Sequence, residues 1–409
     1  MRQYTGQLRA VMMDKNKPIV LLFCRYFLPG RKGGGPIRQY ENLIEAAGSR
    51  LDFRIVTLDR DLGDNAPYDG VPVGEWLEHG PAKVLYLPEA SVDPSRVATI
   101  IDDTAPDIVY LNSFWDRCFT ANFLTARKQR SWPDLPVLFA VRGGFNPAAL
   151  AINRWRKRAY ILWLKWSGRL ANVFWHATTD LEAQILSREF GQQPGFEVLQ
   201  APDLGVAASA DLGAWQPRAA GAQLRLALVS RIAPIKNIEF AIEALSHCKQ
   251  PVSLHIYGPR EDAQYAAECE AMAASLPAHC SVHFAGSIGG HEVVERLSEH
   301  DGFLLPTKGE NFGHVIAEAL AAGTPTMISE RTPWLDKAAG GGCEIASLSE
   351  GPEGWAKRID AWAMLDGEAM RALHEETLAW GAQHLQSDSQ IAEQEALFLK
   401  AIEQASERA

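Results

Sequence analysis

The sequence predicts an α/β protein made of two Rossmann-like, doubly wound domains, each with a mainly parallel sheet. Short apolar runs rich in Val, Ile and Leu alternate with longer amphipathic stretches. Such runs are typical of strands covered by helices on both faces. The alternation stops near residues 203–222 and then restarts, and a chain of 409 residues has room for two or three domains.

The predicted strands fall into two groups, one in each half of the chain. Those of the first half are Ile19–Cys24, Phe53–Leu58, Val84–Leu87, Ile108–Leu111 and Val137–Val141. Those of the second half are Leu224–Val229, Val252–Tyr257, Val282–Ala285, Gly302–Leu305 and Thr324–Ile328. Helical patterns occupy Ile37–Ala47, Ile238–Leu245, Glu292–Glu299 and Ser389–Glu407.

These patterns divide the chain into segments. Residues 1–205 form the first domain, 206–222 a linker rich in Gly, Ala and Pro, 223–385 the second domain, and 386–409 a terminal helix. We expect a cleft between the domains, because ligands of open parallel sheets bind beyond the carboxyl ends of the strands.

Composition excludes several classes of protein. The net charge of -10 argues against sequence-independent DNA binding, which needs excess positive charge. The six cysteines form no C-x-x-C pair, which favours buried thiols in a reducing compartment. The N-terminus lacks the long apolar stretch of a signal peptide, and no window has about 18 uninterrupted apolar residues. We therefore expect a cytoplasmic protein that binds no nucleic acid. The oligomeric state stays open.

Glycines follow the first predicted strand. The loop Gly30–Pro36 contains three consecutive glycines and precedes the helix Ile37–Ala47. Its backbone N–H groups can approach an anion, and a helix N-terminus adds a favourable field, so the loop suits a diphosphate. It matches neither the P-loop pattern nor a clean G-x-G-x-x-G, and a flexible surface turn is the alternative.

Two cations flank the carboxyl end of the strand Leu224–Val229. Arg231 and Lys236 lie between the end of this strand and a helix that is predicted to begin near Asn237. Fixed cations at this edge could neutralise a diphosphate leaving group. The alternative is a pair of solvated basic residues in a loop.

The most informative segment runs from Leu305 to Pro325. A strand leads into a glycine-containing loop, and a helix is predicted to begin near Phe312 or Gly313. Glu310 precedes that helix, and Glu318 lies inside it, with His314 one turn earlier on the same face. The axial separation of the two carboxylates is at most roughly 12 Å at about 1.5 Å per residue. One carboxylate can reach a sugar, the other a ribose diol, and the first N–H groups of the helix can bind phosphate.

This segment, with the E-x7-E spacing of Glu310 and Glu318, resembles the signature of the family 4 glycosyltransferases, which have the GT-B fold and retain anomeric configuration. The likeness extends to Ser230–Asn237, Thr332–Trp334 and Gly30–Pro36, and it covers nearly the whole chain. The stretches Asp59–Asp64, Arg142–Gly144 and His176–Asp180 resemble a bacterial branch linked to surface polysaccharide assembly.

The resemblance implies a role for each matching position. Arg231 and Lys236 would bind the donor diphosphate, Glu310 the donor sugar and Glu318 the ribose. Gly34 and Gly35 would lie against the phosphates from the first domain, and Ile288 would help to hold the nucleobase. The remaining donor-site positions are Asn311, Phe312, Gly313 and His314. Arg142 and Gly143 stand where many relatives have a histidine, which makes them acceptor-side candidates.

The implied reaction moves a sugar, with retention, from a UDP- or GDP-sugar to a glycan or a lipid-linked glycan. We expect no cofactor and no metal, although Asp59-Arg60-Asp61 has the spelling of the metal-binding Asp-x-Asp of another glycosyltransferase fold. The alternatives are a nucleotide-sugar epimerase of GT-B-like fold and a non-catalytic nucleotide-sugar-binding protein.

A basic, aromatic stretch, Arg154–Trp166, is predicted to be helical. It could rest on the cytoplasmic face of an anionic membrane or face a lipid-linked acceptor. The alternative is an ordinary helix with its tryptophans in the core.

Overall fold

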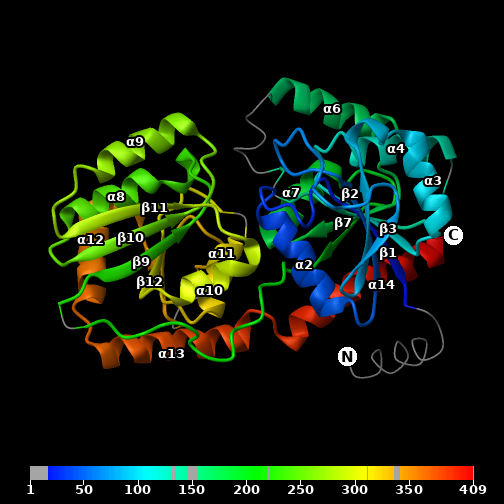
Figure 1. Ribbon diagram of the computed structural model, residues 1–409. Coiled ribbons are helices and arrows are strands. Elements are labelled where there is room, and N and C mark those ends of the chain that lie inside the picture. Colours follow the sequence, from blue (N-terminus) through cyan, green and yellow to red (C-terminus); the bar gives the residue numbers. More distant parts are fainter. Residues whose placement is uncertain are drawn as a thin grey trace. The chain divides into compact units, whose positions relative to one another are not determined.

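The computed structural model describes residues 17–130, 132, 135–142, 144–145, 154–219, 221–310, 312–335 and 341–408. These residues form two compact units, each with its own sheet (Figure 1). The first unit comprises the residues up to Asp203 together with those from Asp388 onward, and the second comprises Leu204–Ser387.

The first unit alternates strands with helices along the chain. Its strands are β1 (Ile19–Phe23), β2 (Asp52–Leu58), β3 (Trp76–His79), β4 (Ala82–Leu87), β5 (Ile108–Asn112), β6 (Val137–Ala140), β7 (Val173–Ala177) and β8 (Glu197–Gln200). Its helices are α2 (Gly35–Ala47), α3 (Pro94–Thr104), α4 (Thr120–Arg130), α6 (Arg154–Trp166), α7 (Asp180–Phe190) and α14 (Asp388–Arg408), with a 3-10 turn at Glu89–Ser91.

The sheet of the first unit has the order β3-β4-β2-β1-β5-β6-β7-β8. All its pairings are parallel except that of β3 with β4. Strands β1, β5, β6 and β7 are almost wholly buried, as the continuous apolar runs predict. The chain leaves β1 toward one edge and returns to β5 on its other side, so the strand order reverses there.

The second unit repeats this plan. Its strands are β9 (Leu224–Val229), β10 (Val252–Tyr257), β11 (Cys280–Gly286), β12 (Gly302–Leu305), β13 (Thr326–Ser329) and β14 (Cys343–Ala346). Its helices are α8 (Ile238–His247), α9 (Ala263–Ala273), α10 (Val293–Ser298), α11 (His314–Ala321), α12 (Gly351–Ala363) and α13 (Gly367–His384). Short 3-10 turns occupy Pro234–Lys236, Gly290–Glu292 and Leu348–Glu350.

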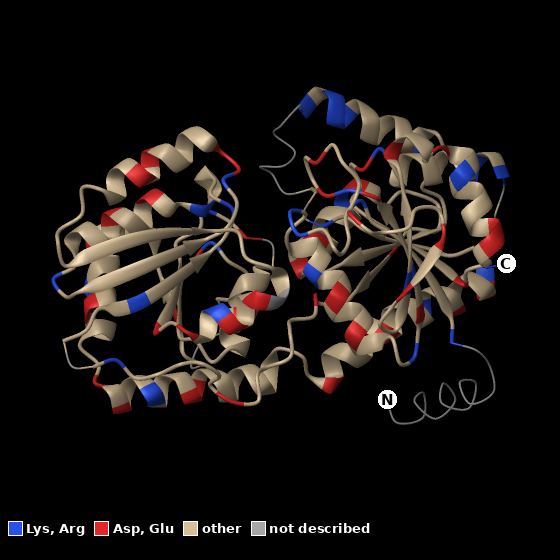
Figure 2. Cartoon of the chain, in the orientation of Figure 1, with Lys and Arg blue, Asp and Glu red and all other residues tan. Residues whose placement is uncertain are grey.

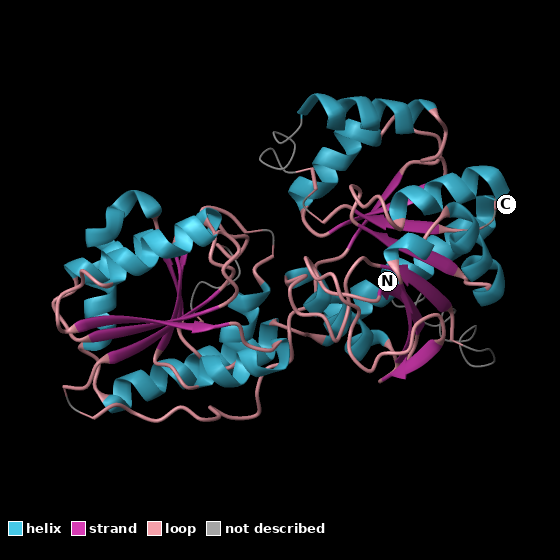
Figure 3. Ribbon diagram, turned by 45° about the horizontal axis from the view of Figure 1, so that its top comes forward, coloured by secondary structure: helices cyan, strands magenta, loops and turns pink. Residues whose placement is uncertain are grey.

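The second sheet has the order β11-β10-β9-β12-β13-β14, and its pairings are parallel. Helices cover both of its faces (Figure 3). One face packs against α8, α9 and α12 through a cluster that includes Leu226, Leu254 and Trp355. The other packs against α10 and α11 through a cluster that includes Phe303, Ile316 and Leu320. The prediction of two doubly wound parallel sheets is confirmed.

Residues 206–222 add to the second unit. Trp215 is only 3% exposed, and its indole Nε1 donates to the buried carboxylate of Asp301 at 3.0 Å. Arg225 binds the same carboxylate through Nη2 at 2.8 Å. A buried side chain therefore anchors a stretch whose composition alone suggests only a linker.

The terminal helix α14 packs on the first unit, beside α2. The ring of Phe398 meets those of Phe53 and Tyr110 edge to face, with centroids 6.0 and 5.2 Å apart. Arg50 also pairs with Glu395. The core of the first unit thus includes residues from both ends of the described chain.

The sequence patterns miss some strands. The predicted list lacks β3, β8 and β14, which are four residues long and half exposed in places, so they show no clear alternation. It also lacks β7, an aromatic strand. His176, the first residue of the stretch His176–Asp180, lies inside β7 and is fully buried.

Candidate active site

The strand order of the second unit reverses at β9. Strand β9 pairs with β10 on one side and with β12 on the other. After β9 the chain continues to β10 on one side, and it later enters the other half of the sheet at β12. The loop that follows β9 and the loop that follows β12 therefore lead away in opposite directions. Loops at such a reversal leave a crevice at the carboxyl ends of the strands, where ligands of open parallel sheets bind. The predicted residues Arg231, Lys236 and Glu310 all belong to these two loops.

Hydrogen bonds tie the two loops together. The amide N–H of Lys308 donates to the carbonyl oxygen of Ile235 at 2.8 Å, and Thr307 Oγ1 donates to the same oxygen at 3.1 Å. The buried side chain of Asn237 donates to the carbonyl of Pro306 at 2.9 Å. Asn237 has φ 59°, a left-handed conformation that Asn tolerates better than most residues. The loop after β9 is therefore held against the loop after β12.

Lys236 and Glu310 meet across this junction. Their side chains form an ion pair, and they are only 13% and 14% exposed. The N–H of Glu310 donates to the carbonyl of Arg331 at 3.1 Å, which fixes the backbone on the other side. Two opposite charges are thus held at the carboxyl edge of the sheet in a site that is partly shielded from water.

Helix α11 begins directly beside this pair. Its N-cap Gly313 has φ 76°, a conformation that favours glycine, and the N–H of Ile316 donates to the carbonyl of Gly313 at 2.8 Å. The rings of Phe312 and His314 lie 4.6 Å apart. The first N–H groups of a helix have no acceptor inside the helix, so this end is suited to an anion.

Two further donor-site candidates pack close to α11. Ile288 and Phe312 are partly buried against the apolar cluster that contains Ile316. Glu318, inside α11, is only 7% exposed. A carboxylate buried to this extent does not fit a merely solvated surface position.

Arg231 is placed differently from Lys236. It is 44% exposed and pairs with Glu261, from the loop after β10. That loop approaches closely: a Cβ at Gly258, whose φ is 147°, would lie 1.8 Å from the carbonyl oxygen of Ser230. Sequence reasoning singled out neither Gly258 nor Glu261. The Tyr257-Gly258-Pro259 turn directly after a strand was a usable signal for the first, whereas the pairing of Glu261 with Arg231 is visible only in three dimensions.

The glycine loop of the first unit is held by an acidic residue. Asp61 Oδ2 accepts from the backbone N–H groups of Arg31 and Lys32 at 2.5 and 3.0 Å. Gly34 is the N-cap of α2 with φ 69°, and Gly35 is the first residue of that helix. The structure thus places both predicted glycines at a helix N-terminus that follows β1.

The two aspartates of Asp59-Arg60-Asp61 have partners within the protein. Asp59 receives Arg60 Nε at 2.8 Å, and Asp61 holds the glycine loop. Across the described ranges, no three His, Cys, Asp or Glu side chains are grouped in a way that could hold a metal ion.

Arg142 lies in a buried polar network of the first unit. Its guanidinium donates to Asp203 at 2.6 Å, to Asn112 at 3.2 Å and to the hydroxyl of Tyr110. The Tyr110 hydroxyl lies 2.8 Å from Nδ1 of His176, whose Nε2 lies 2.9 Å from the carbonyl of Ala201. Burial, with Arg142 nearby, lowers the pKa of His176 from 6.5 to about 4. The imidazole is therefore neutral, donating from Nε2 and accepting at Nδ1.

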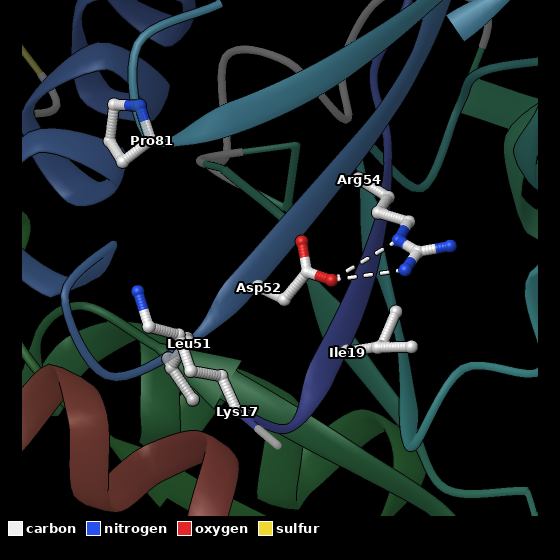
Figure 4. A pocket seen from close by; sticks show the side chains of 6 residues that line it. All are labelled: Lys17, Ile19, Leu51, Asp52, Arg54 and Pro81. Carbon is white, nitrogen blue, oxygen red and sulfur yellow. Dashed lines mark hydrogen bonds and ion pairs between the residues drawn. The ribbon is translucent and has the colours of Figure 1, made fainter. Parts of the chain in front are cut away.

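The opposite edge of this sheet carries a shallow depression of about 280 Å³ (Figure 4). Lys17, Ile19 and Asp52 line it at the amino ends of β1 and β2, and Arg54 pairs with Asp52 there at 3.1 Å. Because parallel sheets bind ligands at their carboxyl edge, we do not assign the site to this depression. Two candidates, Gly143 and Asn311, lie outside the described residues.

Two family models match the chain. The model described as glycosyl transferase 4-like domain matches residues 34–199, and the one described as glycosyl transferases group 1 matches residues 215–377. The chain belongs to the family 4 glycosyltransferases. No curated relative matches it.

Solved structures share the GT-B fold of this glycosyltransferase. A sucrose-phosphate synthase from Thermosynechococcus elongatus has a TM-score of 0.66 and 16% identity over 95% of this chain and 100% of its own. A UDP-forming α,α-trehalose-phosphate synthase from Burkholderia xenovorans has a TM-score of 0.67 and 10% identity over 94% and 100%. WaaG, a glycosyltransferase involved in lipopolysaccharide biosynthesis, has a TM-score of 0.60 and 15% identity over 93% and 99%.

The match to the group 1 model spans Arg231, Lys236, Glu310 and Glu318. Among the helices that the structure describes, none combines the length and apolar character that a membrane crossing needs. The structure of this glycosyltransferase thus brings Lys236, Glu310 and the start of α11 together, and places Arg231 on Glu261.

Proposed function

We propose that this glycosyltransferase moves a sugar, with retention of configuration, from a UDP- or GDP-sugar to a glycan or lipid-linked glycan. The observation that carries the proposal is the Lys236–Glu310 ion pair beside the N-terminus of α11, at the point where the strand order reverses. This arrangement offers a cation, a carboxylate and backbone N–H groups within one shielded corner.

The charges of this corner suit a sugar diphosphate. The oxygens of a diphosphate compete with Glu310 for the ammonium of Lys236, and the α11 N–H groups add donors. Glu310, released from Lys236, accepts hydrogen bonds from the hydroxyls of the donor sugar. Arg231 is exposed enough to turn from Glu261 toward the same phosphates.

The remaining assignments extend this core. Glu318 binds the ribose hydroxyls, and Ile288 lies against the nucleobase. We keep Gly34 and Gly35 as proposed contacts of the first unit. Arg142 is held by Asp203 and Tyr110 in a buried network, so we propose that it positions the acceptor side of the site rather than contacting the acceptor directly.

The reaction needs no protein base. The bond between the sugar C1 and the departing phosphate oxygen breaks as the bond from the acceptor oxygen to C1 forms on the same face. The acceptor proton passes to the phosphate oxygen. The protein supplies positioning and charge stabilisation, chiefly through Lys236. We propose that no metal takes part.

The solved neighbours motivate the choice of donor and setting. One is UDP-forming, the Anabaena protein HepE was solved with UDP and glucose, and WaaG acts in lipopolysaccharide biosynthesis. We extend these properties to this chain as part of the proposal, and with them a cytoplasmic location and a role in bacterial polysaccharide assembly.

The first test is a thermal-shift screen of nucleotides and nucleotide sugars, because a ligand that binds the native state raises its stability. We expect one nucleoside diphosphate and its sugars to raise the melting temperature. Stabilisation by none of them contradicts the proposal. Conversion of a donor to an isomer without acceptor favours the epimerase, and binding without transfer over an acceptor panel favours the non-catalytic alternative.

The second test uses substitutions in the ion pair. Lys236→Ala and Glu310→Ala should each lower transfer by about a hundredfold or more while the fold is kept. Lys308→Ala is the matched control, since Lys308 lies on the same loop, is 47% exposed and pairs with Glu239 at 2.8 Å. Full activity in either pair variant rejects the assignment. Transfer should also persist in excess EDTA, and NMR of the product should show the anomeric configuration of the donor.

A further inference from the structure

Helix α6 has apolar residues on two opposite sides. Ile161 and Leu164 are buried in the first unit. Trp155, Leu162 and Trp166 are 81%, 46% and 89% exposed. These three residues recur at i, i+7 and i+11, which places them on one face of the helix, with the exposed Ala159 between them. The helix therefore presents an aromatic face to its surroundings.

This exposure contradicts the alternative that the tryptophans lie in the core. A Trp side chain buries roughly 150–250 Å² when it packs, so two tryptophans left open in one row are a large uncompensated apolar surface. Contiguous surfaces of this kind mark interaction sites. Trp155 and Trp166 are eleven residues apart, about 16 Å along the axis, so the row suits a flat partner.

The flanks of α6 are strongly basic. The helix contains five Lys or Arg residues and no Asp or Glu. Arg154, Arg156 and Arg158 are exposed, near the amino end where Figure 2 shows a blue segment. Arg158 pairs with Glu189 at 2.9 Å. This local charge stands against a net charge of -10 for the chain, so the partner it fits is anionic.

A basic pocket adjoins the same helix. A cavity of about 180 Å³ is lined by Arg127, Lys128, Trp132 and Arg169, among other residues. The guanidinium of Arg169 lies 4.5 Å from the centroid of Trp163, so the pocket is continuous with α6. Nε of Arg169 is buried without a hydrogen-bond partner in the described part of the chain. Arg127 donates to the carbonyl of Ala171 at 2.8 Å, and burial lowers its pKa to about 10. An anionic oxygen in this pocket would stabilise the charges of Arg127 and Arg169.

We propose that the outer face of α6 and this pocket dock on an anionic phospholipid surface. Trp155, Leu162 and Trp166 enter the interfacial region, the arginines of α6 contact the headgroups, and the pocket with Arg127, Lys128 and Arg169 takes the phosphate of one lipid. A short helix with tryptophans on one face and Lys or Arg beside them binds in the plane of an interface. The surface attracts each nearby cation. This proposal does not rest on the donor-site assignment.

The test is flotation of the full chain with vesicles of phosphatidylcholine alone and of phosphatidylcholine with phosphatidylglycerol. We expect binding to the anionic vesicles, weakened by added salt because exposed charges are screened. Trp155→Ala/Trp166→Ala should lower the partition coefficient by about tenfold or more. Arg156→Gln/Lys128→Gln should lower it about fivefold per charge, on anionic vesicles only.

Matched controls lie on the second unit. Met364→Ala removes a side chain that is 68% exposed, and Lys249→Gln/Lys357→Gln removes two exposed charges. Neither should change vesicle binding. Circular dichroism verifies the fold, and the thermal shift with the donor nucleotide should be unchanged in all variants, which separates this proposal from the donor site.

Three outcomes overturn the proposal. The first is no binding to anionic vesicles, and the second is equal binding by the wild-type chain and the Trp155→Ala/Trp166→Ala variant. The third is a concentration-dependent dimer in light scattering that this variant abolishes, without vesicle binding. That last result would assign the face to a second copy of the chain.

Discussion

Each unit has a well-shielded ion pair near the carboxyl edge of its sheet, and the two pairs differ in how many further hydrogen-bond partners surround them. Lys236 and Glu310 are 13% and 14% exposed, and Arg142 and Asp203 are 10% and 8% exposed. Arg142 also donates to Asn112 and Tyr110, and Asp203 also accepts from Gln39. For the Lys236 and Glu310 side chains, the described contacts are those with each other.

Burial of a charge therefore does not by itself indicate a functional site. A buried charge surrounded by several partners is committed to the fold, because every rearrangement leaves some polar group unpaired. A simple pair at the carboxyl edge of a sheet can exchange one partner for a ligand at a much lower cost in free energy. The contrast between the two pairs can be tested on stability.

The largest expected effect comes from removing Asp203. Asp203→Ala leaves the guanidinium of Arg142 buried without its carboxylate, and we expect a loss of about 3–5 kcal/mol in the free energy of unfolding. The measurement is urea denaturation, followed by a probe in the first unit. Glu310→Ala, measured in the same way, should cost less than half as much. Equal losses in the two variants would remove the distinction between the pairs.

The next effect is a pH dependence that His176 contributes to the stability of the first unit. His176 is neutral in the native state with a pKa of about 4, whereas its unfolded value is 6.5. The unfolded chain therefore takes up a proton first as the pH falls. Stability from this group is complete above pH 6.5 and declines toward pH 4, by about 3 kcal/mol over the whole interval.

The variant His176→Gln isolates this contribution. Gln can donate to Ala201 and accept from Tyr110, but it does not titrate. Its unfolding free energy should fall less steeply between pH 6.5 and pH 4 than that of the wild type. His255 and His374 of the second unit, whose pKa values burial also lowers to about 4, titrate in both chains, so their contributions cancel in the comparison. Parallel curves would contradict a buried neutral His176.

The smallest effect concerns Arg231, whose pair is exposed on both sides. Glu261→Gln should change stability by less than about 1 kcal/mol, since exposed pairs contribute little. It should also tighten binding of a nucleoside diphosphate by up to about fivefold, because Arg231 no longer has to leave Glu261. Isothermal titration would measure this. Weaker binding would mean that Glu261 orients Arg231 for the ligand rather than competing for it.

Local sequence signals predicted most of the fold and part of the site. Continuous apolar runs located strands such as β9, β10 and β12 at their observed ends, because buried strands need them on both faces. The pattern around Glu310 and the turn after β9 predicted that Arg231, Lys236 and Glu310 lie between a strand and a helix. It also predicted that Glu318 lies inside a helix, as it does in α11. The periodicity of the sequence predicts where strands and helices begin and end because their geometry depends on neighbouring residues.

The rest depends on contacts between distant segments, which spacing does not encode. Arg142 and Asp203 are 61 positions apart, and Arg231 and Glu261 are 30 positions apart. The orientation of α6 was also open, since its two apolar faces allow either face to lie inward. Only the burial of Ile161 and Leu164 decides that Trp155 and Trp166 face outward.

The return of α14 to the first unit has a consequence for synthesis of the chain. Phe398 is completely buried there, against residues encoded some 300 codons earlier, such as Phe53 and Tyr110. During translation all of Leu204–Ser387 emerges before that side chain does. The first unit is therefore completed last. Until α14 has been synthesised, the face of the sheet that this helix covers stays exposed, although the inserted second unit already has its full sequence.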